Sequence, residues 1–508
     1  MKKLVSLIVT LVMVLSMAVP AMADDGLSIT IKNATEGHTY EAYQVFKGDL
    51  TKDASGWKIA NAQWGSGVTD AAKAAFGAAD VVAESLTDET VAKTFAVQLE
   101  AYLSGTKADS EYSSGKYVIS GLDEGYYLIK DKDNSLQDDA DAYTTYILKV
   151  ADDTELEPKS SVPTSNKKVD DAADSLSAEN GVLWQDSADY DIGDAVPFQL
   201  TGTLPENFGE YTSYEMIFHD EQSAGLTFNK DSVKVFVTHL QGMDQVAEGY
   251  EVKTVGTHDS NCTFEIVIDD VRQLSDKDGK HIAVTKNSTI VVEYTSTLNE
   301  NAVIGVEGNP NTMYMEFSNN PNHDGEGDTG KTPEDTVIVF TYKAVINKVD
   351  GEMKALKGAG FSLEKYFEST GWTLIKSIPA GDTTVFEFRG LDDGRYRVKE
   401  TETPDGYNSI NDFYFEIIAQ HDTLSDAPKL TLLHSNQIDE NGVNVTENII
   451  FAAEVDLTSG TIASKIVNKS GATLPETGGM GTTLFYIVGA VLVLGAGVAL
   501  IARKRMNK

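Results

Sequence analysis

The sequence predicts a mostly β protein of three tandem immunoglobulin-like β-sandwich domains, with helical insertions in the first. Two observations carry this prediction. Alternating or β-branched runs recur between Gly, Asn and Asp residues, which is the pattern of short antiparallel strands joined by turns. The 508 residues are also enough for about three domains of ordinary size. The predicted strands include residues 27–31, 143–150, 232–237, 263–268, 288–294, 336–341 and 413–418.

An internal repeat supports the division into domains. Residues 121–131, GLDEGYYLIKD, match residues 390–400, GLDDGRYRVKE, so the first and third domains are expected to share a fold. One boundary falls near 160, where Pro158 and Pro163 bracket a Lys-Ser-Ser stretch, and another near 342, after a segment rich in Gly, Asp and Pro. The predicted domains are residues 24–160, 161–342 and 343–470.

One segment of the first domain has a helical pattern. Residues 70–103 are rich in alanine, and Val91, Phe95 and Leu99 recur four residues apart behind Thr87, a candidate N-cap. We predict one or two helices there. Their apolar stripe is expected to pack into the core of the domain rather than to form a binding face.

The amino-acid composition excludes some classes of function and one kind of cross-link. The chain has 41 basic and 78 acidic residues and a net charge of −37. Removing residues 1–23 and 478–508 takes away six basic and no acidic residues, which leaves 35 minus 78, or −43. Nucleic acid is therefore not an expected partner, because phosphate contacts need clustered Lys and Arg. The single cysteine, Cys262, permits no intramolecular disulfide and is expected to be a small buried residue.

The remaining composition offers no pattern for catalysis or metal binding. The eight histidines lack metal-ligand spacing, and the chain contains no nucleophile elbow, phosphate-binding loop or catalytic triad pattern. We predict no metal, no cofactor and no enzymatic activity beyond the self-crosslinking considered below.

The N-terminus has the three parts of a secretory signal peptide. Lys2 and Lys3 precede an apolar run over residues 4–19, and the small-x-small sequence ending at Ala23 is a cleavage site. Residues 1–23 are therefore predicted to be removed on export.

The C-terminus, residues 471–508, has a second three-part pattern. The pentapeptide Leu474-Pro475-Glu476-Thr477-Gly478 is followed by an apolar stretch over 484–502 and by Arg503-Lys504-Arg505. Nineteen helical residues span about 28 Å, close to one bilayer core, and the basic cluster is expected to stay cytoplasmic. This arrangement resembles the sortase sorting signal of Gram-positive surface proteins. The resemblance implies that a sortase cleaves between Thr477 and Gly478 and transfers Thr477 to an amine.

The third domain carries four motifs in order: VINKVD at 345–350, LKGAGFSL at 356–363, ETETPDGY at 400–407 and IVNK at 466–469. Together they resemble the CNA-B-type domain of Gram-positive surface proteins. That resemblance implies an intramolecular isopeptide bond between Lys348 and Asn468, assisted by Glu400. The chemistry is physically reasonable, because burial lowers the pKa of a lysine, while a buried acid can polarise the amide and move the proton.

The middle domain carries a second set of motifs. Its sequence opens with Lys167-Lys168-Val169-Asp170, contains HDEQSAGLTF at 219–228 and ends with YMEFSNNPN at 314–322. These motifs resemble the isopeptide-forming middle domain of fimbrial backbone subunits. The resemblance implies Asp220 as the assisting acid and Asn319 as the acceptor, with Asn320 as a second candidate. The sequence leaves the choice between Lys167 and Lys168 open.

The first domain departs from this pattern. Lys32 and Asp131 stand at the places of the lysine and the acid, but residues 143–157 contain no asparagine. We expect no isopeptide bond there, and we expect Asp131 to be a relic or part of a local ion pair.

Lys159 follows Pro158 at the first domain boundary and resembles the pilin-motif lysine, although Glu157 and Ser160 differ from the usual flanking residues. The whole chain thus resembles a sortase-assembled backbone pilin of a Gram-positive surface fimbria. The resemblance implies export, linkage of Thr477 to Lys159 of a neighbouring copy by a pilus-class sortase, minor or tip pilins as partners, and attachment to peptidoglycan by a housekeeping sortase. The alternative is a monomeric wall-anchored adhesin with CNA-B stalk domains. The sequence identifies no host receptor.

Overall fold

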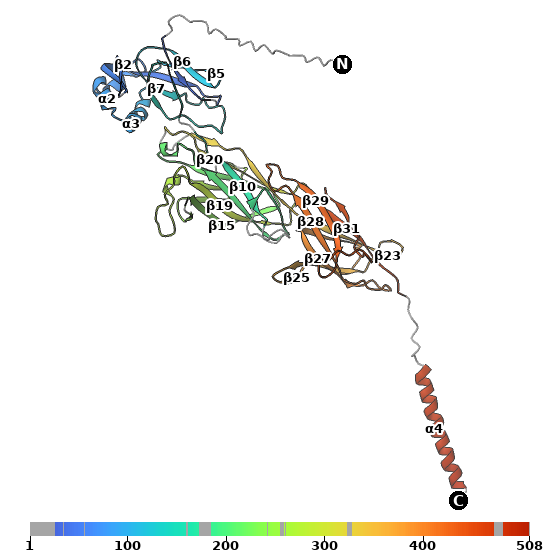
Figure 1. Ribbon diagram of the computed structural model, residues 1–508. Helices are drawn as coiled ribbons and strands as arrows, with labels where there is room; N and C mark the ends of the chain where they lie inside the picture. Colours follow the sequence, from blue (N-terminus) through green and yellow to red (C-terminus); the bar gives the residue numbers. More distant parts are fainter. Residues whose placement is uncertain are drawn as a thin grey trace, which may run out of the picture.

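The structure is a computed structural model that describes residues 26–506 except 34, 55, 159–160, 172–183, 241, 255–258, 260, 323–327 and 472–480. Figure 1 shows three β-rich bodies in a row and a separate helix at the C-terminal end. The prediction of a mostly β protein with tandem sandwiches is confirmed. The predicted signal cleavage site at Ala23, Lys159 and the pentapeptide 474–478 lie outside the described residues.

The first sandwich has two sheets, with strand orders β5-β6-β1-β9 and β3-β2-β7-β8. Alternate residues of the strands point inward, so that Ile29, Ile31, Tyr40 and Tyr117 are almost fully buried between the sheets. The strands are β1 (Leu27–Ile31), β2 (Tyr40–Asp53), β3 (Gly56–Trp64), β4 (Ala108–Asp109), β5 (Glu111–Ser113), β6 (Lys116–Leu122), β7 (Tyr126–Asp131), β8 (Ile147–Val150) and β9 (Thr154–Leu156).

Helices α1 (Asp70–Phe76), α2 (Ala79–Ser85) and α3 (Glu89–Glu100) decorate this sandwich, where one or two were predicted. The prediction of Thr87 as N-cap is wrong, because the Asp88 carboxylate accepts the Val91 amide at 3.0 Å and caps α3 instead. Phe95 and Leu99 pack into the core as predicted. Val91 is 38% exposed and does not belong to that stripe.

The middle sandwich is the largest. Its sheets have the orders β11-β10-β13-β19-β15-β16 and β12-β22-β20-β14-β18-β17, with β21 on β20. Cys262 is buried as predicted, with Sγ 3.7 Å from His219 Nδ1. The strands are β10 (Ser165–Asp170), β11 (Trp184–Gln185), β12 (Ser187–Asp189), β13 (Ala195–Thr203), β14 (Met216–Gln222), β15 (Leu226–His239), β16 (Gly242–Val246), β17 (Glu251–Lys253), β18 (Phe264–Ile268), β19 (Thr289–Leu298), β20 (Asn309–Ser318), β21 (Thr329–Lys331) and β22 (Asp335–Phe340), with short 3-10 helices at Phe208–Glu210 and Val271–Gln273.

The third sandwich packs the sheet β26-β23-β31-β30 against β25-β24-β27-β28-β29. Its first and last long strands, β23 and β31, lie side by side in parallel. The strands are β23 (Tyr342–Asp350), β24 (Gly360–Phe367), β25 (Gly371–Ile378), β26 (Val385–Leu391), β27 (Gly394–Glu402), β28 (Phe413–His421), β29 (Leu430–Ile438), β30 (Glu454–Asp456) and β31 (Thr461–Asn468).

The sequence repeat occupies equivalent places in the first and third sandwiches. It joins β6 to β7 in one and β26 to β27 in the other. Gly121 and Gly390 both have a φ of +72°, a conformation that L side chains rarely adopt. At Gly390, an added Cβ would also lie 2.3 Å from the Ile192 side chain of the middle sandwich. The repeat therefore preserves a backbone conformation that only glycine adopts easily.

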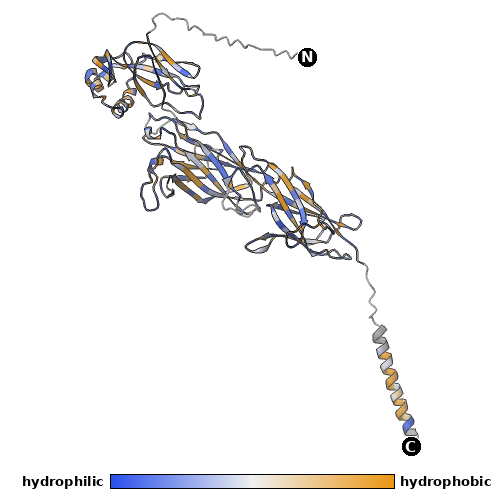
Figure 2. Ribbon diagram, viewed as in Figure 1, coloured by the Kyte–Doolittle hydropathy of each residue, from blue (hydrophilic) through white to orange (hydrophobic). Residues whose placement is uncertain are grey.

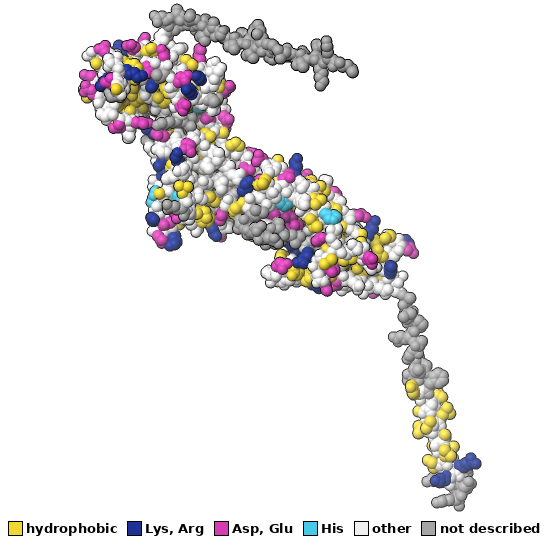
Figure 3. All heavy atoms as spheres, viewed as in Figure 1, with side chains coloured by type: hydrophobic (Ala, Val, Ile, Leu, Met, Phe, Trp, Pro, Cys, Tyr) yellow, Lys and Arg dark blue, Asp and Glu magenta, His cyan; other side chains and the backbone are white. Residues whose placement is uncertain are grey.

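The C-terminal helix α4 (Gly481–Met506) stands apart from the sandwiches. Residues 486–504 are long and apolar enough to cross a membrane. Figure 2 shows hydrophobic residues along most of this helix, and Figure 3 shows basic side chains gathered at its C-terminal end. This helix fits the membrane segment predicted behind the sorting pentapeptide.

Backbone hydrogen bonds connect neighbouring sandwiches. Between the first and second, the Tyr143 amide donates to the Asn319 carbonyl at 2.8 Å, and the Lys331 amide donates to the Asp139 carbonyl at 2.7 Å. Between the second and third, the Asp186 amide donates to the Thr423 carbonyl at 2.9 Å. The sandwiches therefore contact one another directly and in line.

Candidate isopeptide-forming sites

The three residues predicted to react in the third sandwich lie together. Lys348 pairs with Ile466 across the parallel strands, so Asn468 lies two positions further along and on the same face. Glu400 comes from β27 in the opposite sheet, and its Oε1 accepts a hydrogen bond of 2.8 Å from Asn468 Nδ2. Lys348 and Asn468 are buried, at 1% and 0% exposure. The site therefore spans the core of the sandwich.

The environment makes the Lys348 amine easier to deprotonate. Burial lowers the pKa of Lys348 to about 8, although the charges of Glu400 and Asp350 oppose this effect. At neutral pH the Lys348 amine is then unprotonated, and able to act as a nucleophile, in about a tenth of the molecules. Nζ donates to the carbonyls of Ile466, at 3.0 Å, and Val349, at 3.2 Å. These bonds hold the amine at the end of the strand pair.

Glu400 is itself held in place. Its Oε2 accepts hydrogen bonds from Thr403 Oγ1 at 3.1 Å and from the Ile410 amide at 3.2 Å. Oε1 is thereby left to face Asn468. The ETETPDGY segment thus supplies the acid and, through Thr403, one of the two hydrogen bonds that orient it.

In the middle sandwich, the structure separates the two candidate lysines. Lys167 is fully buried, and its Nζ contacts Asp220 Oδ2 and donates to the Tyr294 hydroxyl at 2.9 Å. Lys168 points to the opposite face of β10 and pairs with Asp186. Because successive residues of a strand face opposite sides, only Lys167 reaches the predicted acid.

The amide next to Lys167 belongs to Asn311. Asn311 is fully buried on β20, opposite Gln222 of β14, and its Nδ2 donates to the Tyr294 hydroxyl at 2.8 Å. The same hydroxyl contacts Lys167 and donates to Asp220 Oδ2 at 2.8 Å. Tyr294 thus connects the lysine, the acid and the amide from strands of both sheets.

Asn319, the acceptor predicted from the sequence, lies elsewhere. It follows β20 eight residues after Asn311, about 26 Å further along an extended chain. Its Nδ2 donates to the Asp141 carbonyl of the first sandwich at 3.3 Å. The second candidate, Asn320, donates to Asp328 Oδ2 at 2.8 Å. The structure brings neither residue to Lys167.

Burial shifts both charged partners of the middle site toward their neutral forms. It lowers the pKa of Lys167 and raises the pKa of Asp220, and each shift is opposed by the charge of the other residue. Asp220 Oδ1 and Asn311 Oδ1 have no hydrogen-bond partner among the described residues. The lysine, the acid and the amide therefore meet at the Tyr294 hydroxyl in a fully buried site, where burial favours the uncharged forms of the lysine and the acid.

Among the described residues of the first sandwich, the lysine and the acid at the corresponding places do not meet. Lys32 is exposed and pairs with Glu155 at 2.7 Å, away from Asp131. Asp131 instead accepts a hydrogen bond of 2.8 Å from His38 Nδ1, while His38 Nε2 lies 2.9 Å from Asp141 Oδ2. The local ion pair expected for Asp131 is confirmed. It connects the loop before β8 to the sandwich core.

Raising the pH is expected to weaken the first sandwich through His38. Burial lowers the pKa of His38, but hydrogen bonds and charges from Asp131 and Asp141 outweigh it and raise the pKa to about 9. The His38 interactions therefore stabilise the folded first sandwich fully below pH 6.5. This contribution to the free energy of unfolding is lost as the pH rises through 9. The difference in pKa corresponds to on the order of 3 kcal/mol.

Urea unfolding of residues 24–477 between pH 6 and 10 measures this effect, with Trp57 and Trp64 as fluorescent reporters in the first sandwich. The His38→Asn variant is expected to lose the decline in stability, whereas His434→Asn, at an exposed site of the third sandwich, keeps it. An unchanged decline in the His38 variant would contradict the prediction.

Comparisons with known proteins agree with this architecture. Residues 343–427 match the family model described as the prealbumin-like fold domain SpaA, and residues 466–508 match the LPXTG cell wall anchor motif. The trypsin-resistant surface T6 protein of Streptococcus pyogenes serotype M6 is 26% identical over 403 residues, covering 68% of this chain and 70% of that protein.

A solved structure shows the same fold over most of the chain. The T6 backbone pilin of serotype M6 Streptococcus pyogenes, which has a modular three-domain structure, aligns with a TM-score of 0.56 and 19% identity. The alignment covers 88% of this chain and 98% of the pilin. Together, the two family matches and the homology support a sortase-assembled backbone pilin that is anchored in the cell wall.

Proposed function

We propose that a pilus-class sortase polymerises this chain by joining Thr477 of one subunit to Lys159 of the next. One observation carries the proposal: the chain segments leading to these two residues leave the row of sandwiches at different places. Glu157 and Pro158 follow β9 at the junction of the first two sandwiches, whereas β31 ends the third sandwich at Asn468.

The separation is too large for linkage within one chain. β20 runs from Asn309, near the third sandwich, to Ser318, near the first, and ten residues of strand span about 33 Å. β31 adds about 26 Å beyond the next junction. The six residues from Gly471 to Thr477 reach about 20 Å at most. Thr477 must therefore meet Lys159 of another copy, and repetition of that contact builds an open fibre.

Further steps complete the proposed assembly. A housekeeping sortase transfers the last subunit to peptidoglycan, and minor or tip pilins occupy the ends of the fibre. The chain acts as a sortase substrate, and the only reactions assigned to its own residues are the intramolecular ones below. Such a polymer supports adhesion by holding the tip away from the cell wall.

Replacing Lys159 by alanine is expected to abolish polymerisation. Wall extracts of cells producing the wild-type chain should show a ladder of high-mass species, because each sortase step adds one subunit covalently. The Lys159→Ala variant should give a single species, while Lys58→Ala, which removes an exposed lysine of the first sandwich, should retain the ladder. A single wild-type species would instead favour the monomeric wall-anchored adhesin.

The contacts in the two cores support a second part of the proposal. We infer that Lys348–Asn468 and Lys167–Asn311 become isopeptide bonds, with Glu400 and Asp220 as the assisting acids. In each reaction the unprotonated Nζ attacks the amide Cγ, the carboxyl group moves a proton from Nζ to Nδ2, and ammonia leaves. Folding supplies the proximity that such a reaction needs, so no external enzyme or cofactor is required.

A further inference from the structure

A buried lysine of the third sandwich contacts carboxylates from both sides of the junction with the second sandwich. Lys365 lies on β24 and is 1% exposed. Its Nζ lies 2.5 Å from Oδ2 of Asp191, between β12 and β13, and 3.1 Å from Oδ2 of Asp392, between β26 and β27. Asp392 is fully buried and Asp191 is 7% exposed. An amine and two carboxyl groups therefore meet in the interior of the junction.

Backbone hydrogen bonds hold Asp191 against the third sandwich. The Ile192 amide donates to the Gly390 carbonyl at 3.0 Å, and the Asp392 amide donates to Asp191 Oδ1 at 2.9 Å. The segment carrying Asp191 thus lies directly on the turn that carries Asp392. The carboxyl group that contacts Lys365 is positioned by the backbone and does not depend on a flexible loop.

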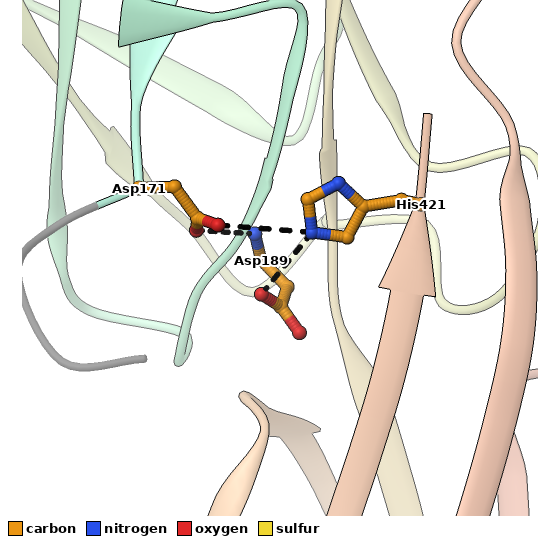
Figure 4. Close-up of side chains that lie close together, drawn as sticks. All are labelled: Asp171, Asp189 and His421. Carbon is orange, nitrogen blue, oxygen red and sulfur yellow. Dashed lines mark hydrogen bonds and ion pairs between the residues drawn. The ribbon is translucent and has the colours of Figure 1, made fainter. Parts of the chain in front are cut away.

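A second polar cluster holds the same junction. Figure 4 shows Asp171 and Asp189 of the second sandwich converging on His421, which ends β28 of the third. His421 Nε2 lies 3.6 Å from Asp189 Oδ1 and 3.8 Å from Asp171 Oδ2, and its Nδ1 lies 2.7 Å from Ser187 Oγ. Asp189 ends β12 two residues before Asp191. These contacts therefore keep the strand before Asp191 in place against the third sandwich.

The two oxygens of Asp191 have different surroundings. Oδ1 accepts the Asp392 amide and has the Tyr396 hydroxyl 3.5 Å away, whereas Oδ2 faces Lys365 Nζ. Donors aimed at one carboxyl oxygen stabilise the negative charge that develops there when a nucleophile attacks the carboxyl carbon. Oδ1 is therefore placed to remain as the carbonyl oxygen, and Oδ2 is placed to leave.

Asp392 is placed as an assisting acid. Its Oδ1 accepts the Asp393 amide at 2.8 Å, and its Oδ2 lies 3.1 Å from Lys365 Nζ. Hydrogen bonds to one oxygen hold Glu400 in the same way, with the other oxygen directed at the reacting group. Asp392 can therefore take a proton from the amine without moving.

The surroundings of Lys365 Nζ are similar to those of Lys167 Nζ in the middle sandwich. The ring centroids of Phe367 and Tyr396 lie 5.5 and 5.9 Å from Lys365 Nζ, and two rings lie 5.5 and 5.4 Å from Lys167 Nζ. Aromatic rings restrict the access of water to both amines. An ion pair in such a place costs desolvation free energy, and a neutral amide removes both charges from the interior.

We propose that Lys365 and Asp191 form an isopeptide bond that joins the second and third sandwiches, with Asp392 as the assisting acid. Within the pair, one proton passes from the ammonium to the Asp191 carboxylate, which gives an amine and a carboxyl group. Nζ then attacks Cγ, Asp392 takes a proton from Nζ and returns it to Oδ2, and Oδ2 leaves as water. Folding supplies the proximity for this step.

The bond would give this junction a second covalent connection. The chain itself passes from the second sandwich to the third between β22, which ends at Phe340, and β23, which begins at Tyr342. One connection allows the sandwiches to bend and twist about it, whereas two connections at separate places oppose both movements. The bond would therefore fix the orientation of neighbouring sandwiches along the fibre.

Mass spectrometry of residues 24–477 tests the bond. The junction bond releases water, about 18 Da, and with the two ammonia molecules from the cores the total loss is about 52 Da. A loss of about 34 Da would leave the core bonds without the junction bond, and a loss of about 18 Da would leave the junction bond alone. The failure of this proposal is thus distinguishable from that of the core bonds, and neither measurement involves sortase.

Tryptic digestion of the denatured chain identifies the two residues. Trypsin does not cleave at an acylated lysine, so the segments containing Lys365 and Asp191 are expected in one branched peptide, about 18 Da lighter than their sum. Lys357 contacts Asp382 Oδ1 at 3.1 Å on the surface of the same sandwich. This exposed pair is an internal control and should yield two separate peptides.

Variants separate a bond from an ordinary buried ion pair. Lys365→Arg keeps the positive charge but should abolish the branched peptide, and Asp392→Asn should reduce it at least tenfold because the proton carrier is missing. Lys357→Arg should retain it in full. Each variant is compared with its own sequence mass.

Two results would overturn the proposal. The first is a wild-type digest in which the peptides of Lys365 and Asp191 are recovered separately, which would show that the pair remains ionic. The second is a branched peptide in which sequencing places the link on Asp392, within the third sandwich. Both results come from the wild-type chain, so the test does not depend on whether a variant folds.

Discussion

The two isopeptide bonds proposed within the sandwich cores are expected to lower the intact mass of residues 24–477 by two molecules of ammonia, about 34 Da in total. Each of these bonds releases one ammonia, because the Asn side-chain nitrogen leaves when the lysine amine replaces it. The proximity of Lys167 to Asn311 and of Lys348 to Asn468 is the reason to expect two bonds. Mass spectrometry of the purified chain measures the deficit directly.

Single variants decide which residues form the bond in the middle sandwich. Asn311→Ala and Lys167→Ala should each reduce this ammonia deficit to one molecule, about 17 Da. Asn319→Ala and Lys168→Ala are matched controls from the same two segments and should retain two losses. If Asn319→Ala removes a loss and Asn311→Ala does not, the assignment of the acceptor to β20 is incorrect. A wild-type chain with its full sequence mass would contradict both bonds.

Replacing Glu400 by glutamine is expected to prevent the bond in the third sandwich and to lower its stability strongly. Glutamine keeps an oxygen near Asn468 but cannot accept and return the proton that the reaction moves. The missing cross-link would reopen a loop of about 120 residues, which the loop-entropy relation values at about 5 kcal/mol. For a domain of this size, that loss lowers the unfolding temperature by roughly 15–20 °C.

Calorimetric unfolding and intact mass should report the same change. The mass of Glu400→Gln should exceed that of the cross-linked wild type by about 16 Da, because the retained ammonia adds about 17 Da and the substitution itself removes about 1 Da. Glu402→Gln is a suitable control, because Glu402 lies two residues further on β27 and is exposed. A Glu400 variant that keeps both the mass deficit and the wild-type unfolding temperature would show that the carboxyl group does not assist the reaction.

The third sandwich could be predicted almost completely because its motifs are local. The segment ETETPDGY contains Glu400 and Thr403, one of the two residues that orient it, and the strands carrying Lys348 and Asn468 are the first and last long strands of the domain. A chain that begins and ends a sandwich with neighbouring strands must bring those two residues close together. The motifs therefore identify the residues, and the observed pairing of β23 with β31 brings them close together.

In the middle sandwich, the sequence does not determine which lysine and which asparagine face the acid. Lys167 and Lys168 are equivalent in the sequence, and only the pairing of β10 determines which one faces the core. Asn311 could have been suspected as an asparagine at an inward position of β20, among Met313, Met315 and Phe317. Its contact with Tyr294 arises across two sheets, however, and no local pattern encodes that contact.

The sequence alone thus determined the β-rich class, the sorting pattern at the C-terminus, the residues of the third-sandwich site and the acid of the middle site. These features depend on alternation, on contiguous motifs and on order along the chain. Tertiary structure decided which lysine and which amide meet at the candidate middle site, and it brought Asp171 and Asp189 of the second sandwich to His421 of the third. Those contacts join strands of different sheets or of different sandwiches, so they depend on register and packing, which residue order does not specify.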